Sequence, residues 1–339
     1  MKRALVLVLL IAAMFTVTAP ANAANGDLQL GFASGSELGR LSPEDLDRQL
    51  QSAADVGATW VRVEMDWGDI EPEPGVFTWD STDRVVASAR AHGLQILGLL
   101  TYTPVWAQRG FVLPGSQQAA PADPNQFGNF AAAAASRYTD SIQTWEIWNE
   151  PNIAVFYGPS VDVRSYLQVL QAGYVRIHEI QPGATVLSGG LSNAQDVLPI
   201  GLSPVAFLNQ LYALGGGAFL DGVAMHPYTT PGYAPDNANW TQMAAMHTTM
   251  QNNGDGGKQI WITEYGAPTG NIGSEQRQSD ILTSALASAN TVPFIARPMF
   301  IHSIRDGGTD PASPEANYGV LRKDFTPKQA FYTLQGMFS

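Results

Sequence analysis

Apolar, β-like runs alternate with helical patterns along almost the whole chain. They recur about every 35 to 40 residues, which is typical of βα units that build a parallel sheet. The runs that predict strands are 28–33, 59–65, 95–100, 143–148, 185–188, 222–226, 259–264 and 294–301. The patterns that predict helices are 43–56, 81–92, 125–137, 163–180, 204–214, 242–252, 275–289 and 327–337. The chain therefore predicts eight βα units.

Eight strands that are each followed by a helix predict an α/β fold of the (β/α)8 TIM barrel type, for which ~250 residues are typical. We expect a single domain over residues 24–339, with the surplus residues in the loops. The main alternative is an open doubly wound sheet, which carries a glycine-rich phosphate loop after its first strand. Here that position reads Gly31-Phe32-Ala33-Ser34-Gly35-Ser36, without the G-x-G-x-x-G spacing or a Walker lysine. The barrel is favoured.

The second predicted strand carries an unusual polar face. Because successive side chains of a strand point to opposite sides, one face is apolar and consists of Val61, Val63 and Met65. The other face consists of Trp60, Arg62, Glu64 and Asp66. A strand that is buried on both faces should be apolar throughout. We therefore expect the polar face to line a barrel lumen near an active site.

The first 23 residues have the pattern of a secretory signal peptide. A basic start at Lys2 and Arg3 precedes an apolar stretch over 4–17 and an A-x-A cleavage signal at Ala21-Asn22-Ala23. The alternative is a membrane anchor, but about 14 apolar residues are fewer than the ~20 needed to span a bilayer. We expect the chain to be secreted, or associated with the cell wall, with no membrane span after cleavage.

The charge balance and the absence of cysteine narrow the possible partners. Without Lys2 and Arg3 the chain has 16 basic and 30 acidic residues, a net charge of −14. This acidity argues against nucleic acid or anionic lipid, since phosphate binding uses clustered Lys and Arg. No cysteine is present, so an exported chain would fold without disulfides.

Two segments place a glutamate at or just after the end of a predicted strand. They read Trp145-Glu146-Ile147-Trp148-Asn149-Glu150-Pro151-Asn152 and Trp261-Ile262-Thr263-Glu264-Tyr265-Gly266. In a parallel barrel, the C-terminal ends of the strands meet at one mouth. Glu150 follows the fourth strand and Glu264 ends the seventh, so both should reach it. A retaining glycosidase needs such a pair, one as acid and one as nucleophile, ~5 to 5.5 Å apart.

At these residues the chain resembles the clan A (β/α)8 retaining glycoside hydrolases. By that resemblance Glu150 is the general acid/base, Asn149 holds the sugar 2-hydroxyl, and Glu264 is the nucleophile. Arg62 matches the clan's arginine near the nucleophile, and its charge should lower the pKa of Glu264. His226-Pro227-Tyr228 is similar to the His-x-Tyr of several member families. The segments 70–80 and 102–107 are most similar to family 39 and its cellulase-like relatives.

One position departs from the pattern of the clan. Its strand eight usually ends in a tryptophan that floors the −1 sugar site, whereas this chain reads Arg297-Pro298-Met299-Phe300-Ile301-His302-Ser303. Phe300 or His302 takes that place, or the sugar sits differently. The departure concerns which sugar is bound more than which reaction occurs.

Other side chains near the strand ends have either a binding or a structural interpretation. We expect Trp106, Trp148 and Tyr157 to contact sugar, because they follow strand ends, and Trp60 and Trp261 to be core. We assign Glu146 to the lumen as a partner of Arg62 or of another buried donor. His226 is interpreted as an oriented hydrogen-bonding group rather than a proton shuttle, and Tyr228 as a group that positions Glu264.

No other chemistry is indicated. Residues 252–257 do not have EF-hand spacing and predict a surface turn. The histidines are scattered, there is no H-E-x-x-H motif, and no G-x-S-x-G elbow indicates a serine hydrolase. We expect neither metal nor cofactor.

The sequence therefore predicts a secreted, monomeric retaining glycoside hydrolase that cleaves a β-linked oligo- or polysaccharide by double displacement. Two alternatives remain open. A transglycosylase would use the same residues but exclude water from the intermediate. A catalytically weak barrel that binds carbohydrate or the cell wall would be compatible with the missing strand-eight tryptophan.

Overall fold

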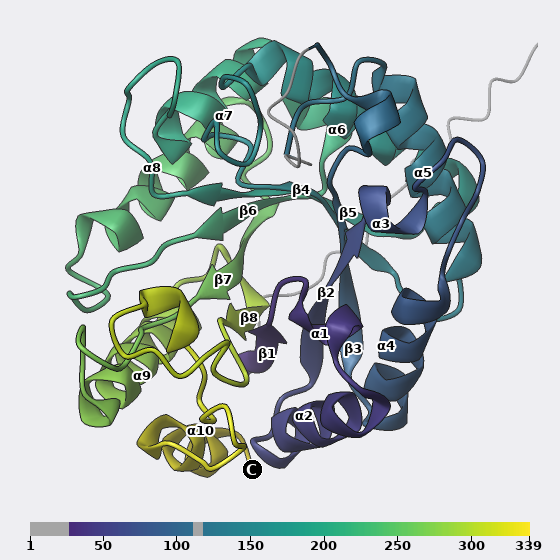
Figure 1. Ribbon diagram of the computed structural model, residues 1–339. Coiled ribbons are helices and arrows are strands. Elements are labelled where there is room, and N and C mark those ends of the chain that lie inside the picture. Colours follow the sequence, from purple (N-terminus) through teal and green to yellow (C-terminus); the bar gives the residue numbers. More distant parts are fainter. Residues whose placement is uncertain (1–26, 111–117) are drawn as a thin grey trace, which may run out of the picture.

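The computed structural model describes residues 27–110 and 118–339, so the predicted signal peptide lies outside the described residues. Eight parallel strands form a closed barrel in chain order (Figure 1). They are β1 (Gln29–Ala33), β2 (Trp60–Asp66), β3 (Gln95–Thr101), β4 (Thr144–Asn149), β5 (Thr185–Ser192), β6 (Gly222–His226), β7 (Gln259–Tyr265) and β8 (Ile295–Ile301). β8 closes on β1 with Met299 opposite Leu30. The predicted (β/α)8 barrel is confirmed.

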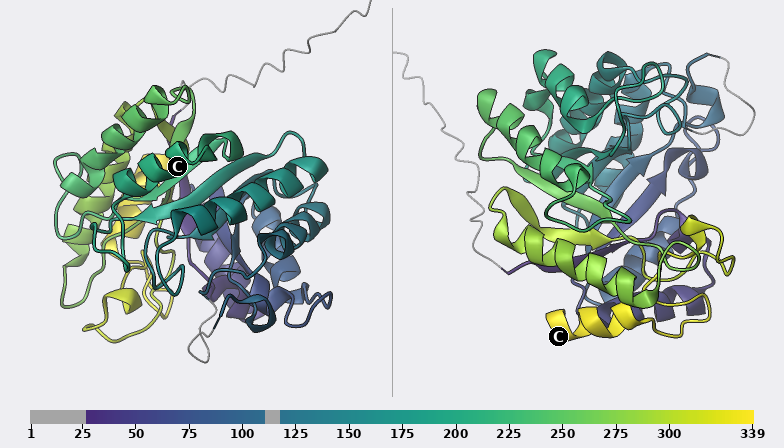
Figure 2. Two further views of the ribbon diagram at one scale, coloured as in Figure 1. Left: turned by 90° about the horizontal axis from the view of Figure 1, so that it is seen from above. Right: turned by 90° about the vertical axis from the view of Figure 1, so that its left-hand side faces the viewer.

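The long helices form a ring outside the strands (Figure 1). They are α2 (Pro43–Asp55), α4 (Asp80–Ala91), α5 (Pro124–Arg137), α6 (Val163–Ile180), α7 (Pro204–Ala213), α8 (Ala238–Asn252), α9 (Glu275–Thr291) and α10 (Gln329–Phe338). α10 packs on α9, and its Gln335 donates to the Asp55 carbonyl at the end of α2. The last helix therefore closes the ring against the first long one; Figure 2 shows the ring from two further sides. None of the described helices is long and apolar enough to cross a bilayer.

The predicted elements differ from the observed ones mainly at their ends. β5 continues to Ser192, four residues beyond the prediction, through a stretch that contains Gly189 and Gly190. α8 begins four residues earlier, because the side chain of Asn237 caps it by accepting from the Asn239 amide. Short elements were not predicted: α1 (Glu37–Arg40), α3 (Trp67–Ile70) and the 3-10 turns η1 (Val105–Ala107), η2 (Gly216–Phe219) and η3 (Pro314–Ala316). η2 lies between α7 and β6, and the others lie in the βα connections.

Aromatic and aliphatic side chains fill one layer of the lumen. Trp60 packs edge-on against Trp261 and Phe300, each with ring centroids 6.2 Å apart. The layer also contains Ala33, Leu97, Leu187 and Ala224. Trp60 lies on β2 two residues before Arg62, so the polar layer begins directly above the packed one. The expectation that Trp60 and Trp261 are core residues is confirmed.

Candidate active site

Six side chains that the sequence singled out come together at the C-terminal ends of four strands. Arg62 is on β2, Asn149 and Glu150 are at the end of β4, His226 and Tyr228 follow from β6, and Glu264 is on β7. Glu150 and Glu264 expose 12% and 17% of their side chains, so both can be reached from outside. The parallel topology brings these residues together, as predicted.

Glu264 is surrounded by groups that favour its ionised form. Its carboxylate accepts from the Arg62 guanidinium and, at 2.9 Å, from the Tyr228 hydroxyl. His226 Nδ1 lies 3.8 Å from the same oxygen that accepts from Tyr228. Burial alone would raise the pKa of Glu264, but the charges of His226, Arg62 and His302 and the Tyr228 hydrogen bond outweigh it and lower that pKa to about 2. The predicted effect of Arg62 is confirmed.

A buried pair with Glu146 holds Arg62 in place. Arg62 donates from Nε and Nη2 to the two Glu146 oxygens, at 2.7 and 2.9 Å. The same carboxylate accepts from the Gly190 amide at 2.8 Å and from the Thr263 hydroxyl at 3.2 Å. A bidentate, fully satisfied pair fixes both partners. The interpretation of Glu146 as a partner of Arg62 is therefore confirmed.

Asn149 is oriented by the same guanidinium. Its side-chain oxygen accepts from Arg62 Nη2 at 3.1 Å, and the residue is buried at the end of β4. Because the oxygen is engaged, the amide nitrogen is the donor of this side chain, and the Tyr102 hydroxyl is one of its partners.

Glu150 leaves the strand through an unusual backbone. Trp148 and Glu150 have φ angles of 74° and 45°, in the left-handed region that non-glycine residues rarely adopt. The Glu150 amide is held by the Gly190 carbonyl at 3.0 Å. This conformation turns the Glu150 side chain toward His226, whose Nδ1 lies 2.9 Å away. Such backbone strain is concentrated at functional sites, and the sequence carries no direct signal for it.

His226 and Glu150 share one proton position. The Thr263 hydroxyl donates to Glu146, so its oxygen must accept from His226 Nε2, 3.1 Å away. Nδ1 and the Glu150 carboxyl then have a single proton between them. Burial lowers the pKa of His226, but the charge of Glu264 and the contact with Glu150 outweigh this and raise it.

The space that the His226 ring occupies depends on a glycine in β5. A Cβ atom placed on Gly190 would lie 2.1 Å from His226 Nε2, closer than any real contact. Gly190 also supplies its amide to Glu146 and its carbonyl to Glu150. Gly190 was not among the predicted site residues, although the Gly189-Gly190 pair near a strand end was the available signal.

Three aromatic residues were predicted to contact sugar, and for two of them the prediction is wrong. Trp148 and Tyr157 are fully buried, and their rings pack edge-on with centroids 5.4 Å apart. Trp148 Nε1 donates to the Phe156 carbonyl, and the Tyr157 hydroxyl bonds with Ser165. The left-handed backbone at Trp148 directs its ring toward Phe127 of α5, and Tyr157 packs on the same ring. Trp106 is partly exposed, and its Nε1 donates to the Glu71 carbonyl at 2.9 Å; its contact with sugar stays a prediction.

The structure also distinguishes between Phe300 and His302, the two residues expected in the place of the strand-eight tryptophan. Phe300 belongs to the packed layer of the lumen and is fully buried, so its predicted place beneath the sugar is wrong. His302 is partly exposed at the mouth, where Nδ1 lies 3.0 Å from the Ala33 carbonyl. Its charge contributes to the low pKa of Glu264.

A third carboxyl group lies on the polar face of β2. Glu64 is partly buried and borders a cavity of about 130 Å³ that Arg40 and Asp66 also line. Burial, with the charge of Asp66, raises the pKa of Glu64 to about 7; Glu264 adds to this effect, whereas Arg62 and Arg40 oppose it. Sequence parity placed Glu64 in the lumen correctly.

The raised pKa predicts a pH-dependent stability. A carboxyl whose folded-state pKa exceeds its unfolded value contributes stability that is present below the unfolded pKa of 4.5 and is lost as the pH rises through about 7. We compare the free energy of unfolding of Glu64→Gln with that of the wild type at each pH. We expect this difference to shift in favour of the variant by up to about 3 kcal/mol between pH 5 and pH 8. Urea unfolding at both pH values measures it.

The exposed glutamate Glu73, in the loop after β2, provides the control. Glu73→Gln should have the same pH dependence as the wild type, because it removes a glutamate outside the lumen. If Glu64→Gln also has the wild-type dependence between pH 5 and pH 8, the ionisation of Glu64 does not affect stability.

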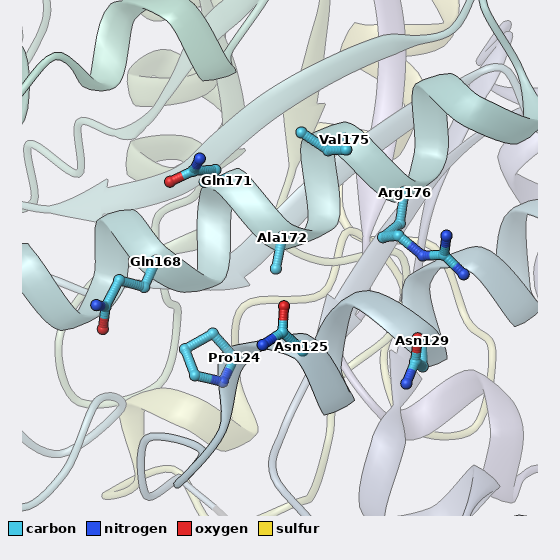
Figure 3. Close-up of a pocket in the computed structure, with 8 residues that line it drawn as sticks. All are labelled: Pro124, Asn125, Asn129, Gln168, Gln171, Ala172, Val175 and Arg176. Carbon is cyan, nitrogen blue, oxygen red and sulfur yellow. The ribbon is translucent and has the colours of Figure 1, made fainter.

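A larger cavity, of about 620 Å³, lies outside the barrel between α5 and α6 (Figure 3). Its lining is formed by Pro124, Asn125, Asn129, Gln168, Gln171, Ala172, Val175 and Arg176. These residues include neither a carboxylate nor a histidine. No cluster of metal-ligating side chains occurs within 27–110 and 118–339 either. The side chains that the sequence singled out lie at the mouth of the barrel and do not line this cavity.

Comparison with known proteins indicates the class of enzyme to which the chain is similar. Residues 22–159, which include β1 to β4 and Glu150, match the family model of glycosyl hydrolase family 10. No curated protein matches the chain. The chain is similar to the structure of a family 39 glycoside hydrolase from the gut symbiont Bacteroides cellulosilyticus WH2, with a TM-score of 0.73, 22% identity and coverage of 92% of this chain and 64% of that one.

Two further structures have the same fold. A monomeric β-xylosidase from Caulobacter crescentus CB15 gives a TM-score of 0.72 at 16% identity, covering 92% of this chain and 68% of that one. The family 39 enzyme from Xanthomonas axonopodis pv. citri gives 0.72 at 17% identity, covering 92% and 67%. The chain thus spans about two thirds of the length of these proteins. At these identities the likeness shows the barrel fold.

The family match and the fold together support a glycosidase with a clan A barrel. The resemblance to clan A that the motifs indicated is confirmed in this sense, and the family 39 structures share the barrel fold with this chain.

Proposed function

We propose that this protein is an exported retaining glycoside hydrolase that cleaves a β-linked glycan by double displacement. The observation that carries the proposal is the meeting of two carboxyl groups at one histidine nitrogen. His226 Nδ1 lies 2.9 Å from a Glu150 oxygen and 3.8 Å from a Glu264 oxygen. These two oxygens can be no further apart than the sum of the distances, about 6.7 Å. This bound includes the ~5 to 5.5 Å that retaining enzymes need between the carboxyl groups and excludes most of the ~6.5 to 9.5 Å range of inverting ones.

In the first step, the ionised Glu264 attacks the anomeric carbon while Glu150 gives its proton to the glycosidic oxygen. The bond between that carbon and oxygen breaks, and the sugar becomes an ester of Glu264. The low pKa of Glu264 keeps it ionised over the working range. The Tyr228 hydroxyl and Arg62 hold the attacking carboxylate in position.

In the second step, Glu150 removes a proton from water, and the hydroxide attacks the anomeric carbon and releases Glu264. Esterification removes the charge of Glu264, which is one of the causes of the raised pKa of His226. The two steps together retain the anomeric configuration.

The product anomer tests this proposal. The panel contains β-glucans, xylans, mannans and arabinogalactan-type polymers with the matching aryl glycosides, and the first product is followed by NMR. We expect cleavage of at least one substrate with the β-anomer formed first. An initial α-anomer would contradict double displacement, and no cleavage of any substrate would contradict the hydrolase. Transfer of sugar to an added acceptor, in preference to water, would instead identify a transglycosylase.

Export rests on the pattern of residues 1–23 alone. Expression of the full chain in a secreting host, followed by N-terminal sequencing of the protein in the medium, tests it. We expect the mature chain to begin at Ala24. A protein that stays inside the cell with Met1 present would contradict export.

A further inference from the structure

Strand eight offers no aromatic platform, but the loop that follows it carries a ring that packs against Tyr228, the tyrosine that contacts Glu264. Tyr318 is in the loop after β8, and it is half-buried. Its ring centroid is 5.0 Å from that of His302 and 5.9 Å from that of Tyr228, the residue that donates to Glu264. The loop therefore brings an aromatic side chain to the mouth.

The ring of Tyr318 is close to the nucleophile, and its hydroxyl is unused. Burial, together with the charges of Glu315 and Glu264, raises the pKa of the Tyr318 hydroxyl to about 12. Its oxygen has no hydrogen-bond partner within the part of the chain that the structure describes. A partly buried tyrosine usually uses its hydroxyl. Here the hydroxyl is available to a ligand.

The backbone beside Glu264 is shaped to accept this ring. A Cβ atom on Gly266, two residues after Glu264, would lie 2.9 Å from Tyr318 Cδ1 and 2.3 Å from the His302 carbonyl oxygen. Only glycine allows the end of β7 and the loop after β8 to approach this closely. Gly266 thus sets the ring of Tyr318 against the strand that carries the nucleophile.

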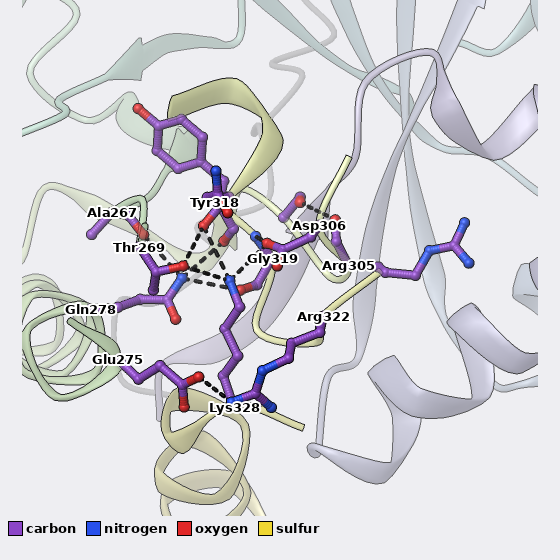
Figure 4. Close-up of polar contacts among 12 residues, drawn as sticks. Ala267, Thr269, Glu275, Gln278, Arg305, Asp306, Tyr318, Gly319, Arg322 and Lys328 are labelled. Carbon is purple, nitrogen blue, oxygen red and sulfur yellow. Dashed lines mark hydrogen bonds and ion pairs between the residues drawn. The ribbon is translucent and has the colours of Figure 1, made fainter. Parts of the chain in front are cut away.

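A buried polar network fixes the backbone on both sides of Tyr318 (Figure 4). Lys328 donates to Asp306 at 2.7 Å, to Thr269 at 2.9 Å and to the Asn317 carbonyl at 3.2 Å. Asp306 accepts from the Gly319 amide at 2.9 Å.

The side chain of Gln278 anchors the same turn. Its amide nitrogen donates to the carbonyls of Ala267, Tyr318 and Gly319, at 3.0 to 3.2 Å. In Figure 4 the Tyr318 ring points away from this network. The ring is therefore preorganised: its backbone is held while its aromatic face is left for another contact.

We propose that Tyr318, backed by His302, is the aromatic wall of the sugar site beside Glu264, in the place that a strand-eight tryptophan has in the clan. The inference rests on the proposed function. The ligand is a pyranose ring whose C–H face packs on the Tyr318 ring, with one sugar hydroxyl bound to the phenol oxygen. Tyr318 is a binding residue, so it acts on the affinity for sugar.

Binding is measured by calorimetry in the Glu264→Gln background, with the best oligosaccharide of the panel. We expect Tyr318→Leu, which keeps an apolar side chain but loses the aromatic face, to weaken binding by about tenfold or more, since buried aromatic anchors dominate such contacts. Tyr318→Phe should stay within about threefold of the parent, because it keeps the ring. In the active enzyme the same variants should raise KM more than they lower kcat.

The exposed Tyr332, on α10, provides the matched control, and Tyr332→Leu should bind like the parent. Thermal unfolding of each variant checks that it is folded. If Tyr318→Leu binds sugar within twofold of the parent, or if Tyr318→Phe loses as much as Tyr318→Leu, the aromatic wall is overturned while the hydrolase stands. If the wild type cleaves no member of the panel, the proposed function is overturned, and this inference with it.

Discussion

Glu264→Ala is expected to lower turnover by roughly 10⁴- to 10⁶-fold, because loss of a covalent nucleophile removes the only route through the glycosyl-enzyme. Arg62 keeps Glu146 and Asn149 as partners, so the variant should still fold. The measurement is kcat on the best aryl glycoside of the panel, with thermal unfolding as the check on folding.

Azide should restore turnover to Glu264→Ala, since a small anion can enter the space that the carboxylate leaves. It attacks the anomeric carbon from the nucleophile side, so the product is an α-glycosyl azide, with inverted configuration. Glu264→Gln is the matched control, because its amide fills the same space and should prevent rescue. If Glu264→Ala keeps wild-type activity without azide, the assignment of the nucleophile is wrong.

Glu150→Ala is expected to lose about 10²- to 10⁴-fold on natural glycans, the usual contribution of a positioned acid. An aryl glycoside with a good leaving group needs little protonation, so its first step should be almost unaffected. The second step loses its base, and the glycosyl-enzyme should accumulate as a burst of the released phenol. Azide should then give a β-glycosyl azide, with retained configuration.

The pH profile gives an independent readout for Glu150. In the wild type the acid must be protonated, so kcat/KM should fall at high pH. In Glu150→Ala, measured on the aryl glycoside, this alkaline limb should be absent. If the variant loses the same factor on glycans and on activated aryl glycosides, the acid role of Glu150 is contradicted.

The proposed catalytic pair could be located from the sequence because strand ends are a strong constraint. The period of two on β2 identified Arg62 and Glu64 as lumen residues, and a parallel barrel brings every C-terminal strand end to the same mouth. The segments around Glu150 and Glu264 could therefore be placed together although 114 positions separate the two residues.

The same reasoning failed where the direction of a side chain departs from strand periodicity. Trp148 and Tyr157 follow strand four and were expected at the mouth, but the left-handed backbone at Trp148 and Glu150 directs the glutamate inward and the tryptophan ring into the core. A positive φ at a non-glycine residue is maintained by tertiary contacts, here the Gly190 carbonyl on the Glu150 amide.

The sequence by itself determined the barrel, the strands that carry Glu150 and Glu264, and the lumen position of Arg62, because these follow from periodicity and from the common direction of parallel strands. Only the tertiary structure decided that Glu150 and Glu264 meet at one nitrogen of His226, and that Tyr318 from a loop packs against Tyr228. Those placements depend on contacts across the barrel, such as the approach at Gly266 and the network around Lys328, which local sequence patterns do not encode.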